Sequence, residues 1–159
     1  MDQKPKKVKK FIQNNDLKDK YDFIFIDCPP TISVYTDAAL IASDFYLVPI
    51  RIDRYSILGI KLLKQVIDRL DDNENIGIKP LGVVYTMVKD LTYKTQQLKS
   101  TFESSEIVQE IGMFEHMTSN VNDLLVGLQG NIASKYKKSR EDICAICKEF
   151  LERIEKYEL

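Results

Sequence analysis

The sequence predicts an α/β fold with a parallel sheet, and three features of its hydrophobic pattern lead to this prediction. Two short apolar runs, at 22–27 and 45–50, have the length and composition of buried strands. A third run, at 81–86, predicts another strand. Segments of helical length separate the three runs, and such connections imply parallel strands with right-handed crossovers.

The first predicted strand ends in a carboxylate and two prolines. Phe23 to Ile26 form an unbroken apolar run, Asp27 follows it, and Pro29 and Pro30 prevent the strand from continuing. A carboxylate at the carboxyl end of a buried strand lies where open α/β sheets bind ligands. An aspartate that caps a helix or forms a turn gives the same pattern, so both interpretations of Asp27 stay open.

The remaining elements are read from apolar spacing and from breaks in it. A helix begins near Pro5 and is broken at 14–16, and polar loops are expected at 51–56 and 71–75. Ser139 with Asp142 three residues later is typical of a capping box at the start of the last helix. Further helices are predicted at 31–43, 58–70, 92–103 and 121–128, and a short strand at 107–111.

Composition indicates one globular domain, 1–159, or most of one. The chain has 159 residues, 44% of them hydrophobic, and a net charge of −1, which excludes a strongly basic nucleic-acid binder. No apolar run is long enough to span a membrane and no signal peptide opens the chain. An odd number of cysteines argues against a disulfide framework, so we expect a cytoplasmic protein. Five lysines lie in the first ten residues, as a solvated helix face or as a contact for DNA or acidic lipid.

One long stretch carries a family resemblance. The sequence YDFIFIDCPPTISVYTDAALIASDFYLVPI, followed by DRYSILGI, resembles the ParA/Soj/MinD family of partition and positioning ATPases, and the resemblance runs from about Tyr21 to the C-terminus. It implies a three-layer P-loop NTPase-like parallel sheet with flanking helices. By position, Asp27 is the Walker B aspartate that holds magnesium through water, and Cys28, Pro29 and Pro30 begin the switch that senses the γ-phosphate.

The phosphate-binding loop of that family has no counterpart in the sequence. The spacing of the P-loop motif occurs only from Gly77 to Gly82, and Val83 follows where the motif requires lysine. Without the amides and lysine of that loop, little remains to neutralise a triphosphate. We therefore expect the C-terminal portion of such an ATPase, lacking the N-terminal P-loop strand and inactive by itself.

The resemblance implies further site residues. Asp53 matches an acidic position near the nucleotide or the dimer face, although capping the following helix explains it equally well. Thr86 and Met87 match the segment near the adenine, and its counterpart at 116–120 lacks the family's proline and arginine. Lys89, Lys94 and Lys99 are candidates for contacts to DNA phosphates, with solvated helix lysines as the alternative.

Two other chemical signals are weak. Cys144 and Cys147 have the spacing of a redox pair, but they lie inside a predicted helix rather than at its start, so we expect buried packing. His116 is the single histidine, and we expect it to be a loop residue rather than a base.

The family implies ATP and Mg²⁺ as cofactors of the complete protein, a homodimer, a ParB-like partner, non-specific DNA binding and association with the nucleoid. Whether this chain is an enzyme stays open. Two other hypotheses are a non-enzymatic interaction module derived from such an ATPase and an unrelated doubly wound ligand-binding domain. Because the P-loop strand is central in this fold class, we expect the chain to pair 22–27 with 45–50, to self-associate, or to be marginally stable.

Overall fold

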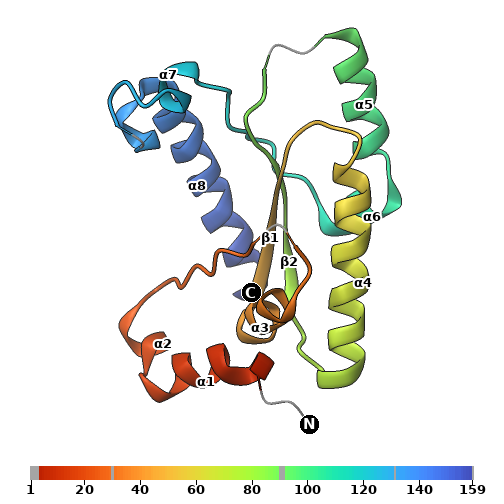
Figure 1. Ribbon diagram of the computed structural model, residues 1–159, viewed down its shortest axis with the longest axis vertical. Helices are drawn as coiled ribbons and strands as arrows, with labels where there is room; N and C mark the ends of the chain where they lie inside the picture. The colour runs from red at the N-terminus through yellow and green to blue at the C-terminus, as the bar shows by residue number, and fades with distance from the viewer. Residues whose placement is uncertain (1–3, 30, 90–91, 131, 159) are drawn as a thin grey trace. The chain divides into compact units, whose positions relative to one another are not determined.

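A computed structural model of the protein describes residues 4–29, 31–89, 92–130 and 132–158 (Figure 1). These residues fall into two compact units. Unit 1 contains the chain up to Tyr46 together with Lys61–Lys79, and unit 2 contains Leu47–Ile60 together with the chain from Pro80 onward. The expectation of a single domain stays a prediction.

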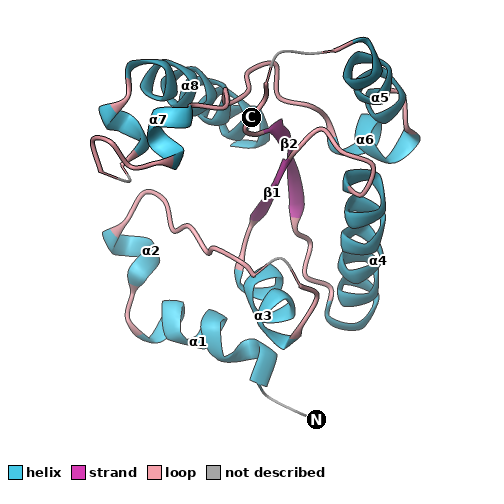
Figure 2. Ribbon diagram, turned by 45° about the horizontal axis from the view of Figure 1, so that its top comes forward, coloured by secondary structure: helices cyan, strands magenta, loops and turns pink. Residues whose placement is uncertain are grey.

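Helices make up most of the regular structure, and two strands form the sheet (Figure 2). In chain order the elements are η1 (Lys4–Lys6), α1 (Lys7–Asn14), α2 (Leu17–Lys20), α3 (Val34–Ala42), β1 (Phe45–Ile50), α4 (Ser56–Glu74), β2 (Lys79–Tyr85), α5 (Tyr93–Glu103), α6 (Glu106–Ile111), α7 (Asn122–Leu125), η2 (Ala133–Lys135) and α8 (Lys137–Glu158).

The two strands are parallel and α4 connects them. The Lys79 N–H donates to the Asp44 carbonyl at 3.1 Å, and the Thr86 N–H donates to the Ile50 carbonyl at 2.7 Å. The residue numbers of the paired positions rise together, which is the register of a parallel pair. The predicted α/β fold with parallel strands is therefore confirmed for these two strands, while the three layers and the missing P-loop strand stay predictions.

The strand predicted at 22–27 is wrong. Residues 23–29 have no regular secondary structure, and the sheet of the described chain contains only β1 and β2. An extended segment becomes a strand only through hydrogen bonds to a neighbouring strand. Phe23 and Phe25 instead contact one another, with ring centroids 6.4 Å apart, and Phe25 remains largely exposed.

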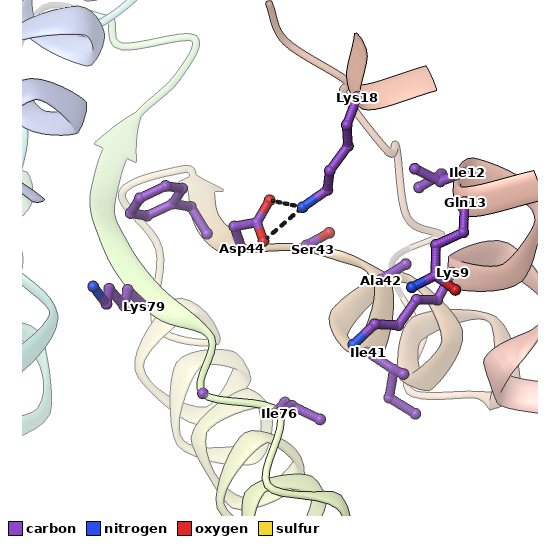
Figure 3. Close-up of a pocket in the computed structure, with 12 residues that line it drawn as sticks. Lys9, Ile12, Gln13, Lys18, Ile41, Ala42, Ser43, Asp44, Ile76 and Lys79 are labelled. Atoms are coloured by element: carbon purple, nitrogen blue, oxygen red, sulfur yellow. Dashed lines mark hydrogen bonds and ion pairs between the residues drawn. The ribbon is translucent and has the colours of Figure 1, made fainter. Parts of the chain in front are cut away.

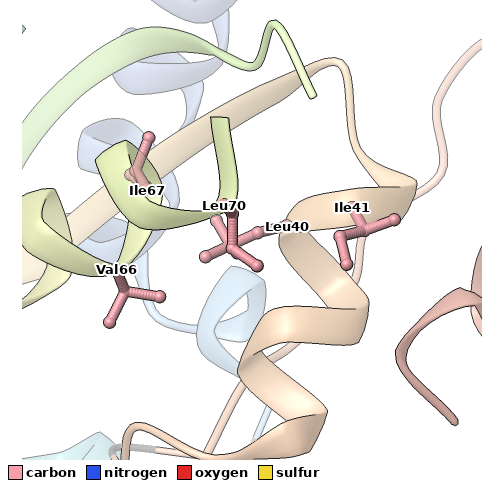
Figure 4. Packing of buried hydrophobic residues seen from close by; sticks show 5 residues of the cluster. All are labelled: Leu40, Ile41, Val66, Ile67 and Leu70. Atoms are coloured by element: carbon pink, nitrogen blue, oxygen red, sulfur yellow. The ribbon is translucent and has the colours of Figure 1, made fainter. Parts of the chain in front are cut away.

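Unit 1 is built on the packing of α3 against α4. Ser33 begins α3 by accepting the Tyr35 N–H with its side chain. Figure 4 shows the cluster between the two helices, in which burial of each large side chain contributes about 1.5–3 kcal/mol. Its buried members are Leu40, Ile41, Val66, Ile67 and Leu70.

The predicted loop at 71–75 is wrong because α4 continues to Glu74. Leu70 is buried near the helix end, and Asn75 then adopts a left-handed backbone with φ of 49°. The Asp71 carboxylate accepts the Gly77 N–H at 2.8 Å, so the polar residues that suggested a loop instead end the helix and hold the turn after it.

In unit 2, two predictions of secondary structure fail. The strand predicted at 107–111 is the helix α6, whose buried Val108 and Ile111 are three residues apart. The predicted capping box is also wrong, because α8 begins at Lys137 and Ser139 is buried within it. The carboxylate of Asp142 accepts the Ser119 N–H at 2.7 Å instead of capping α8.

Candidate functional site

The predicted Walker B segment lies in unit 1 as an exposed extended stretch. Asp27, Cys28 and Pro29 are all exposed, and Pro30 lies outside the described residues. Partial burial raises the pKa of the Cys28 thiol, and the charge of Asp27 raises it further. The two side chains are therefore close enough to interact, and the thiol is kept protonated.

Asp27 by itself does not make a magnesium site. Among the described residues, no three His, Cys, Asp or Glu side chains come together as a metal site would require. Magnesium prefers six oxygen ligands, which one carboxylate, water and substrate phosphates can share. The exposed Asp27 fits that role only where a nucleotide supplies the remaining oxygens.

Asp53, in unit 2, begins helix α4. One of its carboxylate oxygens accepts the N–H groups of Tyr55 at 2.9 Å and Ser56 at 3.0 Å. The Ser56 hydroxyl lies 3.1 Å from the same oxygen and 2.6 Å from the Arg51 carbonyl. These contacts satisfy free N–H groups at a helix start, as the capping interpretation expects, and the role of Asp53 near the nucleotide or the dimer face stays a prediction.

Thr86 and Met87, also in unit 2, follow β2 directly. The Thr86 hydroxyl donates to the Ile50 carbonyl at 3.0 Å and so joins the ends of β1 and β2. Met87 has a left-handed backbone with φ of 55°, which is uncommon for a residue with a side chain. The Met87 N–H donates to the Thr118 hydroxyl at 3.0 Å, which stabilises this turn of the chain.

Residues 113–120 run parallel to the end of β2. Val83 bridges to Met113 and Val88 bridges to Ser119, both in parallel register. This brings Thr86 and Met87, which match the segment near the adenine, beside residues 116–120, which lack the family's proline and arginine. A small cavity of about 120 Å³ lies beside them, with Met87, Asn120, Leu124 and Ile143 in its wall.

Two side chains of helix α8 bind main-chain groups of residues 113–116. The Glu149 carboxylate accepts the N–H groups of Glu115 and His116, at 2.9 Å and 3.1 Å. Arg153 binds the same carboxylate and donates to the Leu81 and Met113 carbonyls. The sequence does not indicate either role, since a Glu and an Arg four residues apart on a helix are typical of an exposed ion pair.

The two buried carboxylates of α8, Asp142 and Glu149, have lowered pKa values in the folded protein. Burial raises the pKa of Glu149, but hydrogen bonds from His116, Glu115 and Arg153 outweigh it, so the net pKa is lowered. Burial likewise raises the pKa of Asp142, and contacts with Lys138 and Ser119 lower it further than burial raises it. Both side chains are thus fixed negative charges behind residues 115–119.

The three lysines proposed for DNA contact differ in their surroundings. Lys89 and Lys94 are exposed. Lys99 lies 2.6 Å from the Glu103 carboxylate and 5.4 Å from the ring centroid of Tyr85. Burial raises the pKa of the Tyr85 phenol, and the charge of Glu103 adds to the effect. Lys99 therefore interacts locally with Glu103 and Tyr85 in unit 2.

The prediction that Cys144 and Cys147 are buried is wrong, because both thiols are exposed. Asp142 and Glu149 lie on the buried side of α8, and Cys144 and Cys147 lie on its exposed side. His116 is a loop residue as expected, but its Nδ1 lies 2.9 Å from the Glu149 carboxylate, a partner that the sequence does not indicate.

Unit 1 contains a second candidate binding region, a pocket of about 390 Å³ near the start of β1 (Figure 3). Lys18 spans it and contacts both carboxylate oxygens of Asp44, at 3.1 Å and 3.0 Å. Lys9 and Gln13 of α1 contribute to the wall. The Lys18–Asp44 pair is exposed, so it contributes at most about 1 kcal/mol to stability.

Comparison with known proteins identifies relatives for part of the chain. A family model described as an AAA domain matches residues 2–79. The chromosome-partitioning ATPase Soj of Treponema pallidum is 31% identical over 83 residues, which cover 52% of this chain and 33% of that protein. The chromosome partitioning protein ParA of Myxococcus xanthus is 37% identical over 68 residues, covering 43% and 24%.

A further relative is the sporulation initiation inhibitor protein Soj of Bacillus subtilis, 33% identical over 72 residues that cover 45% of this chain and 28% of that protein. The matches to these three relatives span between 24% and 33% of the relatives' lengths. Within the part of the chain that the structure describes, no helix is both long and apolar enough to cross a membrane.

Proposed function

This chain belongs to the ParA-like family, and from that premise we propose that it is the portion of a ParA-type ATPase that follows the P-loop and acts in plasmid or chromosome partition. The observation that carries the proposal is the match of residues 2–79, which include the Asp27–Pro30 motif. The ParA and Soj proteins that it resembles are named for chromosome partitioning.

In this proposal each site residue has a defined role. Asp27 orients a magnesium ion through water once a nucleotide supplies phosphate oxygens, and Cys28 to Pro30 respond to the γ-phosphate. Thr86 and Met87 lie near the base together with residues 116–120. The hydrogen bond from the Met87 N–H to the Thr118 hydroxyl supports a joint role of the two segments.

The proposal extends to partners. A complete partition ATPase of this type uses ATP, forms a homodimer, responds to a ParB-like protein and binds DNA without sequence preference. The exposed ammonium groups of Lys89 and Lys94 support a contact with DNA phosphates, which needs only charge. A protein with these properties would be found in the cytoplasm, associated with the nucleoid.

A non-enzymatic interaction module is the second candidate. It is favoured because candidate site residues already bind other groups of the same chain. The Asp53 carboxylate is occupied by the start of α4, and the Thr86 hydroxyl is occupied by the Ile50 carbonyl. The run from Gly77 to Gly82 leads into β2, where its backbone belongs to a strand instead of a phosphate loop. A module of this kind would keep a protein partner and bind no nucleotide.

A titration with a fluorescent ATP analogue, with and without magnesium, separates the two candidates. We expect weak magnesium-dependent binding that Asp27→Ala abolishes, while Asp22→Ala, a control at an exposed acid of the same segment, retains it. Binding that ignores magnesium, or that both variants lose equally, contradicts a role for Asp27. No binding up to millimolar nucleotide fits a portion that lacks its P-loop as well as the interaction module, and attention then moves to the protein partner.

A further inference from the structure

The loop that connects α7 to α8 exposes large apolar side chains. Val126 and Leu128 are each 71% exposed, and Leu125 and Ile132 are more than half exposed. Four such side chains lie within eight residues of the chain, and we call them the apolar loop (Leu125, Val126, Leu128 and Ile132). Large apolar side chains exposed close together mark interaction sites.

Hydrogen bonds hold the apolar loop in a defined shape. Tyr136 is buried, and its hydroxyl accepts the Gln129 N–H at 2.9 Å and donates to the Gly130 carbonyl at 2.8 Å. The Leu128 N–H donates to the Asp123 carbonyl at 3.1 Å. Gly127 and Gly130 supply the positive φ angles, 70° and 83°, that these turns need. These hydrogen bonds therefore hold the backbone of residues 128–130.

A basic segment follows the apolar loop directly. Lys135, Lys137, Lys138 and Arg140 are exposed and lie within six residues. Two of these four cations are paired within α8, Lys137 with Glu141 at 4.0 Å and Lys138 with Asp142 at 2.7 Å, and Asp123 is a further exposed anion nearby. Figures 1 and 2 both place α7 beside the beginning of α8, and the basic segment begins three residues after Ile132 in the chain.

We propose that the apolar loop and the basic segment dock unit 2 onto an anionic lipid surface. Aliphatic side chains beside lysine and arginine fit the boundary between acyl chains and negatively charged headgroups. A nucleic acid fits the loop less well, because single strands bind by stacking on aromatic rings and the ring of Tyr136 is buried. This function goes beyond the proposed role in partition.

The test is co-sedimentation of the whole chain with vesicles of phosphatidylcholine, with and without phosphatidylglycerol. We expect binding to the anionic vesicles, weakened by about tenfold or more in the double variant Val126→Ser with Leu128→Ser. Lys135→Gln with Arg140→Gln should weaken it by about fivefold per charge. Circular dichroism establishes that each variant is folded.

The matched control is Leu58→Ser with Leu151→Ser, which removes two exposed leucines of unit 2 outside the apolar loop and should leave binding unchanged. Equal binding to neutral vesicles, an equal loss in the control, or no binding at all overturns the proposal. Light scattering and a duplex DNA titration complete the test. If the loop variants leave vesicle binding unchanged but dissociate a dimer, the surface binds a second copy of the chain. If they weaken DNA binding instead, the surface binds nucleic acid.

Discussion

The Glu149 carboxylate accepts the backbone N–H of Glu115 at 2.9 Å, so a side chain of α8 fixes the main chain of a segment more than thirty residues earlier. The same carboxylate binds the His116 N–H and the Arg153 guanidinium. Such charge-assisted bonds do not depend on the side chains of the segment they hold. Residues 115–119 could thus vary in sequence and keep their position.

Glu149→Gln should destabilise unit 2 by about 2–4 kcal/mol, because it weakens two amide contacts and leaves the partly buried Arg153 without its anion. Urea unfolding followed by circular dichroism measures the change. Glu152→Gln, at an exposed position of the same helix, is the control and should change stability little. Equal effects of both variants would mean that the Glu149 carboxylate does not stabilise the segment at 115–116.

The same carboxylate makes stability depend on acid pH. The folded-state pKa values of Glu149 and Asp142 are lowered, so the folded protein binds fewer protons than the unfolded chain. Their contribution is complete above the unfolded pKa values of about 4 and is lost as the pH falls through the lower folded values. Unfolding measured between neutral pH and pH of about 3 should therefore show a steeper loss in the natural protein than in Glu149→Gln. Parallel curves would contradict the assignment.

Gly82→Ala should lower the free energy of unfolding by about 2–4 kcal/mol. Gly82 has a φ of 143°, and a Cβ atom there would lie 2.9 Å from the Arg153 guanidinium and 2.9 Å from the Phe114 ring. Arg153 itself packs 4.2 Å from the centroid of Phe114, so neither group has room to withdraw. Gly59→Ala is the matched control, since open space surrounds Gly59 in α4, and it should stabilise the protein by about 0.5–1 kcal/mol. Destabilisation by both changes would point to a general sensitivity of the chain.

Local patterns predicted β1, β2 and the apolar faces of the long helices, because periodicity and buried length carry that information. The sequence could not reveal the roles of Asp142, Glu149 and Arg153, since their partners lie more than twenty residues away along the chain. The prediction of a strand at 22–27 failed for a different reason. Its residues fit a strand, but a ladder also needs a neighbour, which no local pattern contains.

The site residues that the resemblance implies stay predictions. The resemblance matched Thr86 and Met87 to the segment near the adenine, with a counterpart at 116–120, and hydrogen bonds join these two segments in unit 2. The sequence left two interpretations of Asp53; its bonds to Tyr55 and Ser56 form a helix cap, and its role near the nucleotide or the dimer face stays a prediction. The exposed cysteines of α8 were mispredicted because apolar spacing does not reveal which face two buried carboxylates will occupy.

The thiols should react in an order set by their surroundings. Cys144 and Cys147 are exposed and should modify rapidly with a disulfide reagent in the folded protein. Cys28 should react more slowly at the same pH, because its raised pKa leaves less thiolate. Comparing Cys28→Ser with the natural chain isolates the slow phase. Rapid modification of all three thiols would contradict the raised pKa of Cys28.

The extended segment at 23–25 should drive self-association. Phe25 is 75% exposed and its neighbours Phe23 and Ile24 are exposed beside it, in an apolar stretch whose backbone lies outside the sheet. Such a stretch can bury its apolar side chains against a second copy. Phe25→Asp should therefore shift the chain toward a monomer in sedimentation velocity across a concentration series. Tyr55→Asp, at a residue that is 80% exposed in the loop before α4, is the control and should leave association unchanged. A natural chain that stays monomeric at every concentration, or a control that dissociates equally, would show that the exposed phenylalanines do not form an interface.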